Sequence, residues 1–173
     1  MRCLTDSECV EWLEAEGFER ANRLPAADGG YEICFQIPAE ARTQRMLARD
    51  LAVWLDPRGS TLLWLKDWRI HKPDETALVA ALRRGHGERR AWDAAPGHLF
   101  EVSEKDELAA WIGLAMSFCW DGFLCAPPWR EDRLEVTHEE LVGLATASPE
   151  RFATARGLAR RYEADIYRET EVS

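Results

Sequence analysis

Short apolar runs separated by turn residues predict a set of β-strands along this chain. The run 31–37 alternates between polar and apolar residues, as in a strand with one buried face. The run 61–65 is almost continuously apolar and suits a strand that is buried on both faces. Similar short runs, rich in branched and aromatic residues, recur in the second half of the chain. The expected strands are Tyr31–Ile37, Thr61–Leu65, His98–Val102, Trp120–Cys125 and Arg133–Thr137.

Helix-start signals and 3.6-residue periodicity predict helices between these runs. Thr5 and Glu8 have the spacing of a capping box, in which each side chain bonds the backbone N–H of the other residue. Thr137 and Glu140 repeat that spacing before an apolar run. The expected helices are Thr5–Phe18, Ala39–Leu55, Pro73–Arg84, Ser103–Phe118, Thr137–Ala147 and one that starts at Ser148–Pro149 and keeps a buried stripe as far as Ile166.

The order of these elements predicts the fold class. Helices and strands are interspersed without a regular βαβ repeat, so we expect an α+β fold with a mixed or mostly antiparallel sheet of about five strands. A length of 173 residues lies within the usual size of one domain, and residues 1–173 are interpreted as a single α+β domain. The segment 85–97, with three glycines and a proline, is the clearest expected loop.

The net charge limits the kinds of molecule that this protein is expected to bind. Thirty-one acidic against 22 basic residues give a formal charge of −9, which repels phosphate backbones and anionic membrane surfaces. Nucleic acid and membranes are therefore not expected as ligands. A basic protein would be attracted, because complementary charge accelerates association. Solubility alone is the competing explanation for a charge of this size.

Cysteine usage indicates a reducing compartment. The five cysteines are odd in number and contain no Cys-x-x-Cys pair, which argues against a disulfide framework and a zinc ribbon. Cys119 and Cys125 lie in apolar runs and are interpreted as buried thiols rather than nucleophiles. The first residues lack the apolar stretch of a secretory leader, and no expected helix is long enough to span a bilayer. We expect a cytoplasmic protein, and no cofactor or metal motif is visible.

Histidines and neighbouring acids supply the candidate catalytic residues. The four histidines are His71, His86, His98 and His138. His98, Asp121, His138 and Glu139 would form a catalytic or metal site if the sheet brought them together, which predicts a small hydrolase or metal-dependent enzyme. The structural alternative is that Asp121 closes a turn with the following glycine and that His138 helps to cap a helix. Both interpretations stay open.

A basic segment offers a second kind of site. Arg89, Arg90 and Trp92 combine cations with an aromatic ring in a glycine-containing loop, a mixture suited to a phosphate or an acidic ligand. The spacing of a phosphate-binding loop is missing. Surface pairing and favourable charge near a helix C-terminus are the competing explanation.

Five short motifs carry a resemblance to known proteins. They are Ile70–Glu75, Leu82–Glu88, Ala95–Phe100, Phe118–Asp121 and Thr137–Glu140. Together they resemble a group of small uncharacterised bacterial proteins, over about Tyr31 to Leu144. This resemblance implies a bacterial cytosolic α+β domain and no particular reaction. The Trp-Asp strand followed by a His-acid helix start also resembles immunity proteins that neutralise secreted bacterial toxins.

These features favour a non-enzymatic interaction protein, of the immunity or antitoxin type, that binds a basic partner through an acidic face. The expected contact residues are Glu8, Glu11, Trp12 and Glu14 on the first helix and Glu163, Asp165 and Glu169 near the end of the last helix. The small hydrolase or metal-dependent enzyme is the alternative. A structural role within an assembly is a third hypothesis and predicts a large exposed apolar patch. The sequence does not rank oligomeric states.

Overall fold

One antiparallel sheet forms the centre of the structure. The computed structural model describes residues 1–18, 30–68, 73–128 and 131–172. In these residues the strands are β1 Arg2–Leu4, β2 Gly30–Gln36, β3 Thr61–Asp67, β4 Gly97–Phe100, β5 Asp121–Cys125, β6 Arg133–Val136, β7 Leu141–Thr146 and β8 Ile166–Val172. The helices are α1 Asp6–Ala15, α2 Ala41–Trp54, α3 Pro73–Gly85, α4 Lys105–Ser117 and α5 Pro149–Arg161, and a 3-10 turn, Val102–Glu104, precedes α4.

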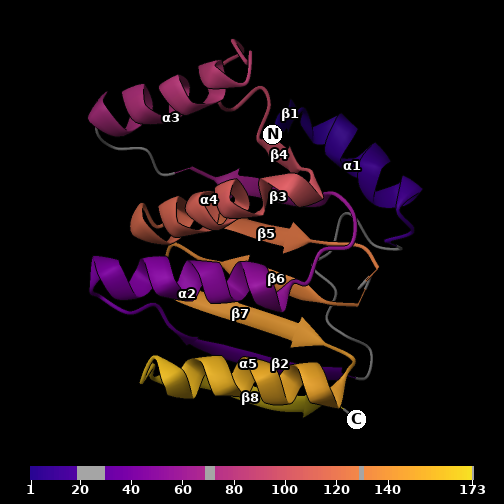
Figure 1. Cartoon of the computed structure of the whole chain (residues 1–173), viewed down its shortest axis with the longest axis vertical. Coiled ribbons are helices and arrows are strands. Elements are labelled where there is room, and N and C mark those ends of the chain that lie inside the picture. The colour runs from indigo at the N-terminus through magenta and orange to yellow at the C-terminus, as the bar shows by residue number, and fades with distance from the viewer. Residues whose placement is uncertain (19–29, 69–72, 129–130, 173) are drawn as a thin grey trace.

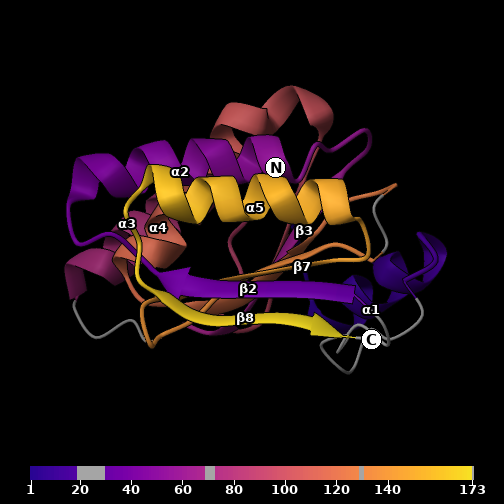
Figure 2. The same cartoon turned by 90° about the horizontal axis from the view of Figure 1, so that it is seen from below.

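The eight strands have the order β1-β4-β3-β5-β6-β7-β2-β8, and every pair of neighbours is antiparallel. Helices α2, α4 and α5 lie on one face of this sheet (Figure 1). Helix α1 lies on the opposite side, at the end formed by β1, β4 and β3 (Figure 2). The fold is therefore α+β, as the sequence predicts, with eight strands instead of five.

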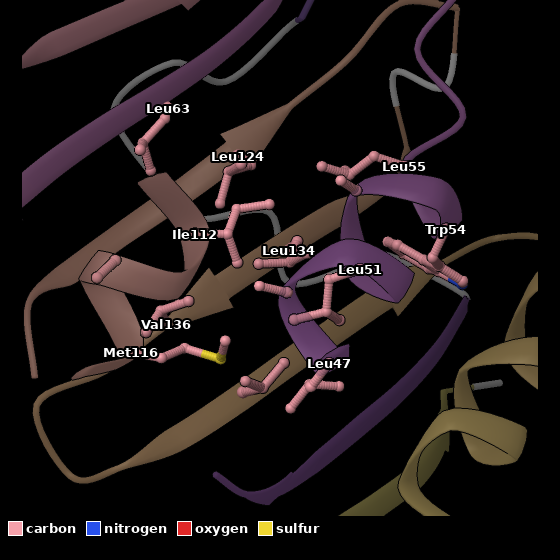
Figure 3. Packing of buried hydrophobic residues seen from close by; sticks show 14 of the residues in the cluster. Leu47, Leu51, Trp54, Leu55, Leu63, Ile112, Met116, Leu124, Leu134 and Val136 are labelled. Atoms are coloured by element: carbon pink, nitrogen blue, oxygen red, sulfur yellow. The ribbon is translucent and has the colours of Figure 1, made fainter. Parts of the chain in front are cut away.

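Two hydrophobic clusters lie on the two faces of the sheet. Leu63 and Leu65 of β3 belong to the larger one, whereas Leu62 and Trp64 of the same strand belong to the smaller one beside α1. Figure 3 shows side chains of α2 and α4 packed against those of β3, β5 and β6 in the larger cluster. The continuously apolar sequence of β3 thus reflects burial on both faces, as expected.

Strong local signals placed most elements correctly. Thr5 and Glu8 form the predicted capping box at the start of α1. Ser148 caps α5, and Pro149 occupies its first turn. The strands predicted at 31–37, 61–65, 120–125 and 133–137, the helices at 39–55 and 73–84 and the loop after α3 are also confirmed. No helix in the described part of the chain is both long and apolar enough to cross a membrane.

The helix predicted at 137–147 is wrong, because this segment forms the β6–β7 hairpin. The Thr137 N–H donates to the Leu141 carbonyl at 3.0 Å, and the Glu140 N–H donates to the Thr137 carbonyl at 3.1 Å. Glu140 turns the chain with φ +61°. Val142 and Leu144 then reach the large cluster only when the chain is extended between β6 and β2, so long-range burial overrides the local capping signal.

The chain ends also differ from the prediction. Helix α5 stops at Arg161, and Glu163, with φ +50°, closes its C-terminus before the chain turns back as β8. Ile166, expected in a buried helical stripe, is exposed on this edge strand. Strand β1 was also missed. The helix expected to start at Ser103 begins at Lys105 as α4, and Ser103 lies in the preceding 3-10 turn, where Glu101 and Glu104 form a capping box.

Candidate functional site

The structure brings Asp121 and His138 into direct contact. Asp121 opens β5, and His138 lies in the turn between β6 and β7. The Nδ1 atom of His138 is 2.9 and 2.8 Å from the two carboxylate oxygens of Asp121, and the His138 backbone N–H donates to one of them at 2.5 Å. Because an ionised carboxylate only accepts hydrogen bonds, Nδ1 carries the proton and Nε2 is left as the basic nitrogen of the neutral ring. Both side chains are partly exposed, at 28% and 36%.

The other two residues proposed with this pair do not join it. His98 is completely buried and packs against Trp68 and Trp111, at ring-centroid distances of 5.4 and 4.3 Å. Burial is the main reason that its pKa is lowered to about 3, so the imidazole is neutral. Glu139 is exposed in the hairpin turn. Among the described residues, no hydrogen bond or ion pair links His98 or Glu139 to the Asp121–His138 pair. His71 lies outside the described residues.

The basic segment is largely engaged within the molecule. The guanidinium of Arg90 contacts Glu88 at 2.5 Å and donates to the Cys3 carbonyl at 3.1 Å. This pairing lowers the pKa of Glu88 to about 2. Arg89 is exposed, and Trp92 packs against Trp68 with a centroid distance of 5.6 Å. Of the three predicted ligand-binding residues, Trp92 therefore lies at a cavity, and Arg90 serves the fold.

The acidic residues of α1 have separate roles. The Glu8 carboxylate accepts the Thr5 N–H at 2.7 Å, and this hydrogen bond is the main cause of its lowered pKa. Trp12 is half-buried and stacks on Phe18. Glu11 and Glu14 are exposed. Glu8 therefore stabilises the start of the helix, and Glu11 and Glu14 are available to attract a partner.

The acids near the C-terminus lie at the other end of the sheet from α1. Glu163 and Asp165 belong to the connection between α5 and β8, and Glu169 lies in β8. Strands β1 and β8 are the two edges of the sheet, separated by seven strand spacings. At about 4.8 Å per spacing, the two edges are about 34 Å apart. The two predicted acidic regions therefore do not form one surface.

An open cavity lies where the start of α1, the end of β3 and the segment 92–96 meet. It has a volume of about 620 Å³. We call it the Trp–Asp pocket, because its walls contain Asp6, Trp64, Asp67, Trp68, Trp92 and Asp93. Three carboxylates against the single ammonium of Lys66 leave a formal charge of −2 at its walls. Aromatic faces beside carboxylates form a surface suited to a cation.

The ammonium of Lys66 is bound in the wall of this pocket by an aromatic ring and a carboxylate. This ammonium lies 3.0 Å from the centroid of the Trp64 ring and 3.9 Å from the Asp6 carboxylate. Asp6 also accepts the Trp64 indole N–H at 2.7 Å, which fixes the orientation of the ring. Burial is the main cause of the lowered pKa of Lys66, and the charge of Asp6 opposes it. The wall of the pocket thus already holds one cation.

Helical spacing extends the acidic wall beyond the pocket. Ser7 and Val10 of α1 line the pocket, and Glu11 and Glu14 follow them by four residues each. Residues four apart lie on the same side of a helix, so these two exposed acids continue the face that borders the pocket. The sequence analysis identified Trp92, Glu11 and Glu14 but missed Asp6, Lys66 and Asp93. The alternation of Trp64, Lys66 and Trp68 was the available signal.

Comparison with known proteins adds no assignment to this geometry. No protein-family model, no curated protein and no solved structure matches the chain.

Proposed function

We propose that the protein is a non-enzymatic interaction module that binds a basic protein, and that the Trp–Asp pocket receives an arginine or lysine side chain of this partner. The observation that carries the proposal is the contact of Lys66 with Trp64 and Asp6. A cation from the same chain is already held there by a ring face and a carboxylate. A cationic side chain of a partner would be accommodated by the same chemistry.

The part of the pocket beyond Lys66 supplies the contacts for such a side chain. Trp68 and Trp92 lie at its walls with Asp67 and Asp93. A cation over an indole ring contributes about 0.5–1 kcal/mol when exposed and about 2 kcal/mol or more when water is excluded. Arginine suits this environment particularly well, because its planar guanidinium both stacks on aromatic rings and pairs with carboxylates.

Long-range charge supports the same partner. The net charge of −9 attracts a basic protein, and Glu11 and Glu14 continue the acidic face beside the pocket. Exposed charges mainly accelerate encounter, whereas a desolvated anchor in a pocket provides most of the binding energy. This division of roles suits an immunity protein that neutralises a basic toxin.

The test uses a fluorescein-labelled arginine-rich peptide and fluorescence anisotropy. Wild-type protein should bind the peptide saturably at low salt, and binding should weaken at about 0.3 M salt because of screening. The double variant Asp93→Asn/Glu14→Gln should bind roughly tenfold more weakly, and Trp92→Ala roughly three- to tenfold more weakly.

A charge-matched control separates the pocket from net charge. The double variant Glu163→Gln/Asp165→Asn also removes two negative charges but lies at the β8 end of the sheet. It should change affinity less than about twofold. Equal losses in the two double variants, or no saturable binding by the wild type, would contradict the proposal. Circular dichroism establishes that each variant is folded.

The Asp121–His138 contact favours a second candidate, a small hydrolase. A carboxylate that orients Nδ1 leaves Nε2 as a general base, the arrangement found in many hydrolytic sites. A panel of chromogenic esters and phosphate esters tests it, with His138→Ala and Asp121→Asn as variants. Turnover that both substitutions abolish would support an enzyme. Activity that survives them, or no turnover by the wild type, would leave the pair with a structural role in the hairpin.

A further inference from the structure

The turn after α3, the start of α4 and Met1, which precedes β1, meet at one corner of the structure. Helix α3 closes with Gly87 at φ +81° and a hydrogen bond from the Glu88 N–H to the Arg83 carbonyl at 3.0 Å. This turn presents His86. Figure 1 shows the N-terminus close to the same end of α3. The amine nitrogen of Met1 lies 3.4 Å from Nδ1 of His86.

Two carboxylates of the α4 start face His86 at this corner. The Nε2 atom of His86 is 2.5 Å from Oε1 of Glu107. One carboxylate oxygen of Glu104 completes a trio in which all ligand atoms lie within 4.8 Å of one another. The side chains of His86, Glu104 and Glu107 are only 30%, 27% and 28% exposed. Carboxylates at a helix N-terminus are favoured in their ionised form by the helix dipole.

Glu104 is held in place by the backbone. Its Oε2 atom accepts the Glu101 N–H at 2.8 Å, as part of the capping box. Its other carboxylate oxygen, Oε1, contacts the ammonium of Met1. This contact is the main cause of the lowered pKa of Glu104. The positively charged ammonium of Met1 thus lies beside two of the three side chains, those of His86 and Glu104.

We infer that His86, Glu104 and Glu107 form a binding site for a borderline divalent cation, of which Zn²⁺ is the representative. Zn²⁺ binds imidazole nitrogen at about 2.0–2.1 Å and carboxylate oxygen at about 2.0–2.2 Å, so its tetrahedral ligands stand about 3.4 Å apart. The three ligand atoms lie within 4.8 Å of one another, and because Glu104 is fixed by the Glu101 N–H, a rotation of the Glu107 side chain is the adjustment that this spacing requires. Ca²⁺ and Mg²⁺ prefer sites made of oxygen alone. The imidazole therefore selects zinc-like ions.

The bound cation replaces the Met1 ammonium as the partner of Glu104 and links the turn after α3 to the start of α4. Three protein ligands leave at least one coordination position for water. Because the ligand atoms converge only in the folded chain, the cation stabilises the fold and raises its melting temperature. This site is separate from the Trp–Asp pocket, and its test does not depend on the proposed function.

The experiment is isothermal titration calorimetry of the full chain with ZnCl₂, after treatment with EDTA and desalting. Wild-type protein should bind one equivalent, and the melting temperature should rise with added zinc. His86→Ala and Glu107→Gln should each weaken binding at least tenfold. Glu150→Gln removes an exposed carboxylate from the first turn of α5, away from this corner, and should leave the affinity unchanged. Circular dichroism in EDTA confirms that the variants are folded without metal.

Cysteine thiolates are the main competing ligands and are distinguished by Co²⁺ spectroscopy. All five cysteines are free thiols, and Cys119 is the most accessible of them. A site made of one nitrogen and two oxygens gives no thiolate-to-metal charge-transfer band, and Cys119→Ser should bind like the wild type. The inference is overturned by a thiolate band, by unchanged affinity in His86→Ala and Glu107→Gln, or by wild-type zinc binding weaker than about 100 μM.

Discussion

His98 should make this protein sensitive to mild acid. Its imidazole is fully buried between Trp68 and Trp111, and the backbone of Pro96 is a hydrogen-bonding group beside it. Burial lowers its pKa from 6.5 to about 3, and the positive charge of Arg83 contributes in the same direction. Protonation would place an uncompensated charge among aromatic rings, which unfolding relieves.

The sign and size of the effect follow from proton linkage. Between pH 6.5 and 3, the unfolded chain binds a proton at His98 that the folded chain does not bind. The free energy of unfolding therefore falls as the pH decreases through this window. At pH 5 the loss is about 2 kcal/mol relative to neutral pH, because one pH unit is worth about 1.36 kcal/mol. This figure does not depend on the folded pKa as long as it stays well below 5.

Urea unfolding of the wild type and of His98→Leu at pH 7 and pH 5 measures this contribution. Leucine has a similar size and carries no group that can be protonated, so the variant removes the pH-dependent contribution at this position. The variant should retain about 2 kcal/mol more of its free energy of unfolding at pH 5 than the wild type retains. Equal losses in His98→Leu and the wild type would refute the argument.

Two backbone positions give further predictions that urea unfolding checks. Glu140→Gly should stabilise the protein by about 1 kcal/mol, because φ +61° disfavours a side chain; an unchanged or lower midpoint would contradict this. Gly97→Ala should destabilise it by about 1–3 kcal/mol, since the new Cβ would lie 2.2 Å from the Sγ of Cys9. Gly59→Ala, whose nearest contact is 3.9 Å away, is the matched control, and equal effects at the two glycines would show that close packing is not the cause.

The candidate sites were only partly predictable, because they depend on contacts between distant segments. The sequence singled out Asp121 and His138, and antiparallel pairing of β5 with β6 brings them together. The same reasoning added His98, which the fold instead buries among aromatic rings. The Trp–Asp pocket joins segments near residues 6, 66 and 93, and no local pattern marks that convergence.

What the sequence by itself determined are the elements whose signals lie within a few neighbouring residues. The capping box of α1, the Ser148–Pro149 start of α5 and the apolar run of β3 act through local hydrogen bonds, backbone geometry and periodicity. Only the tertiary structure decided that Leu141–Thr146 is a strand and that the chain ends on the sheet edge as β8. These segments gain partners and burial from β6 and β2, and that free energy outweighs a capping signal worth about 1 kcal/mol.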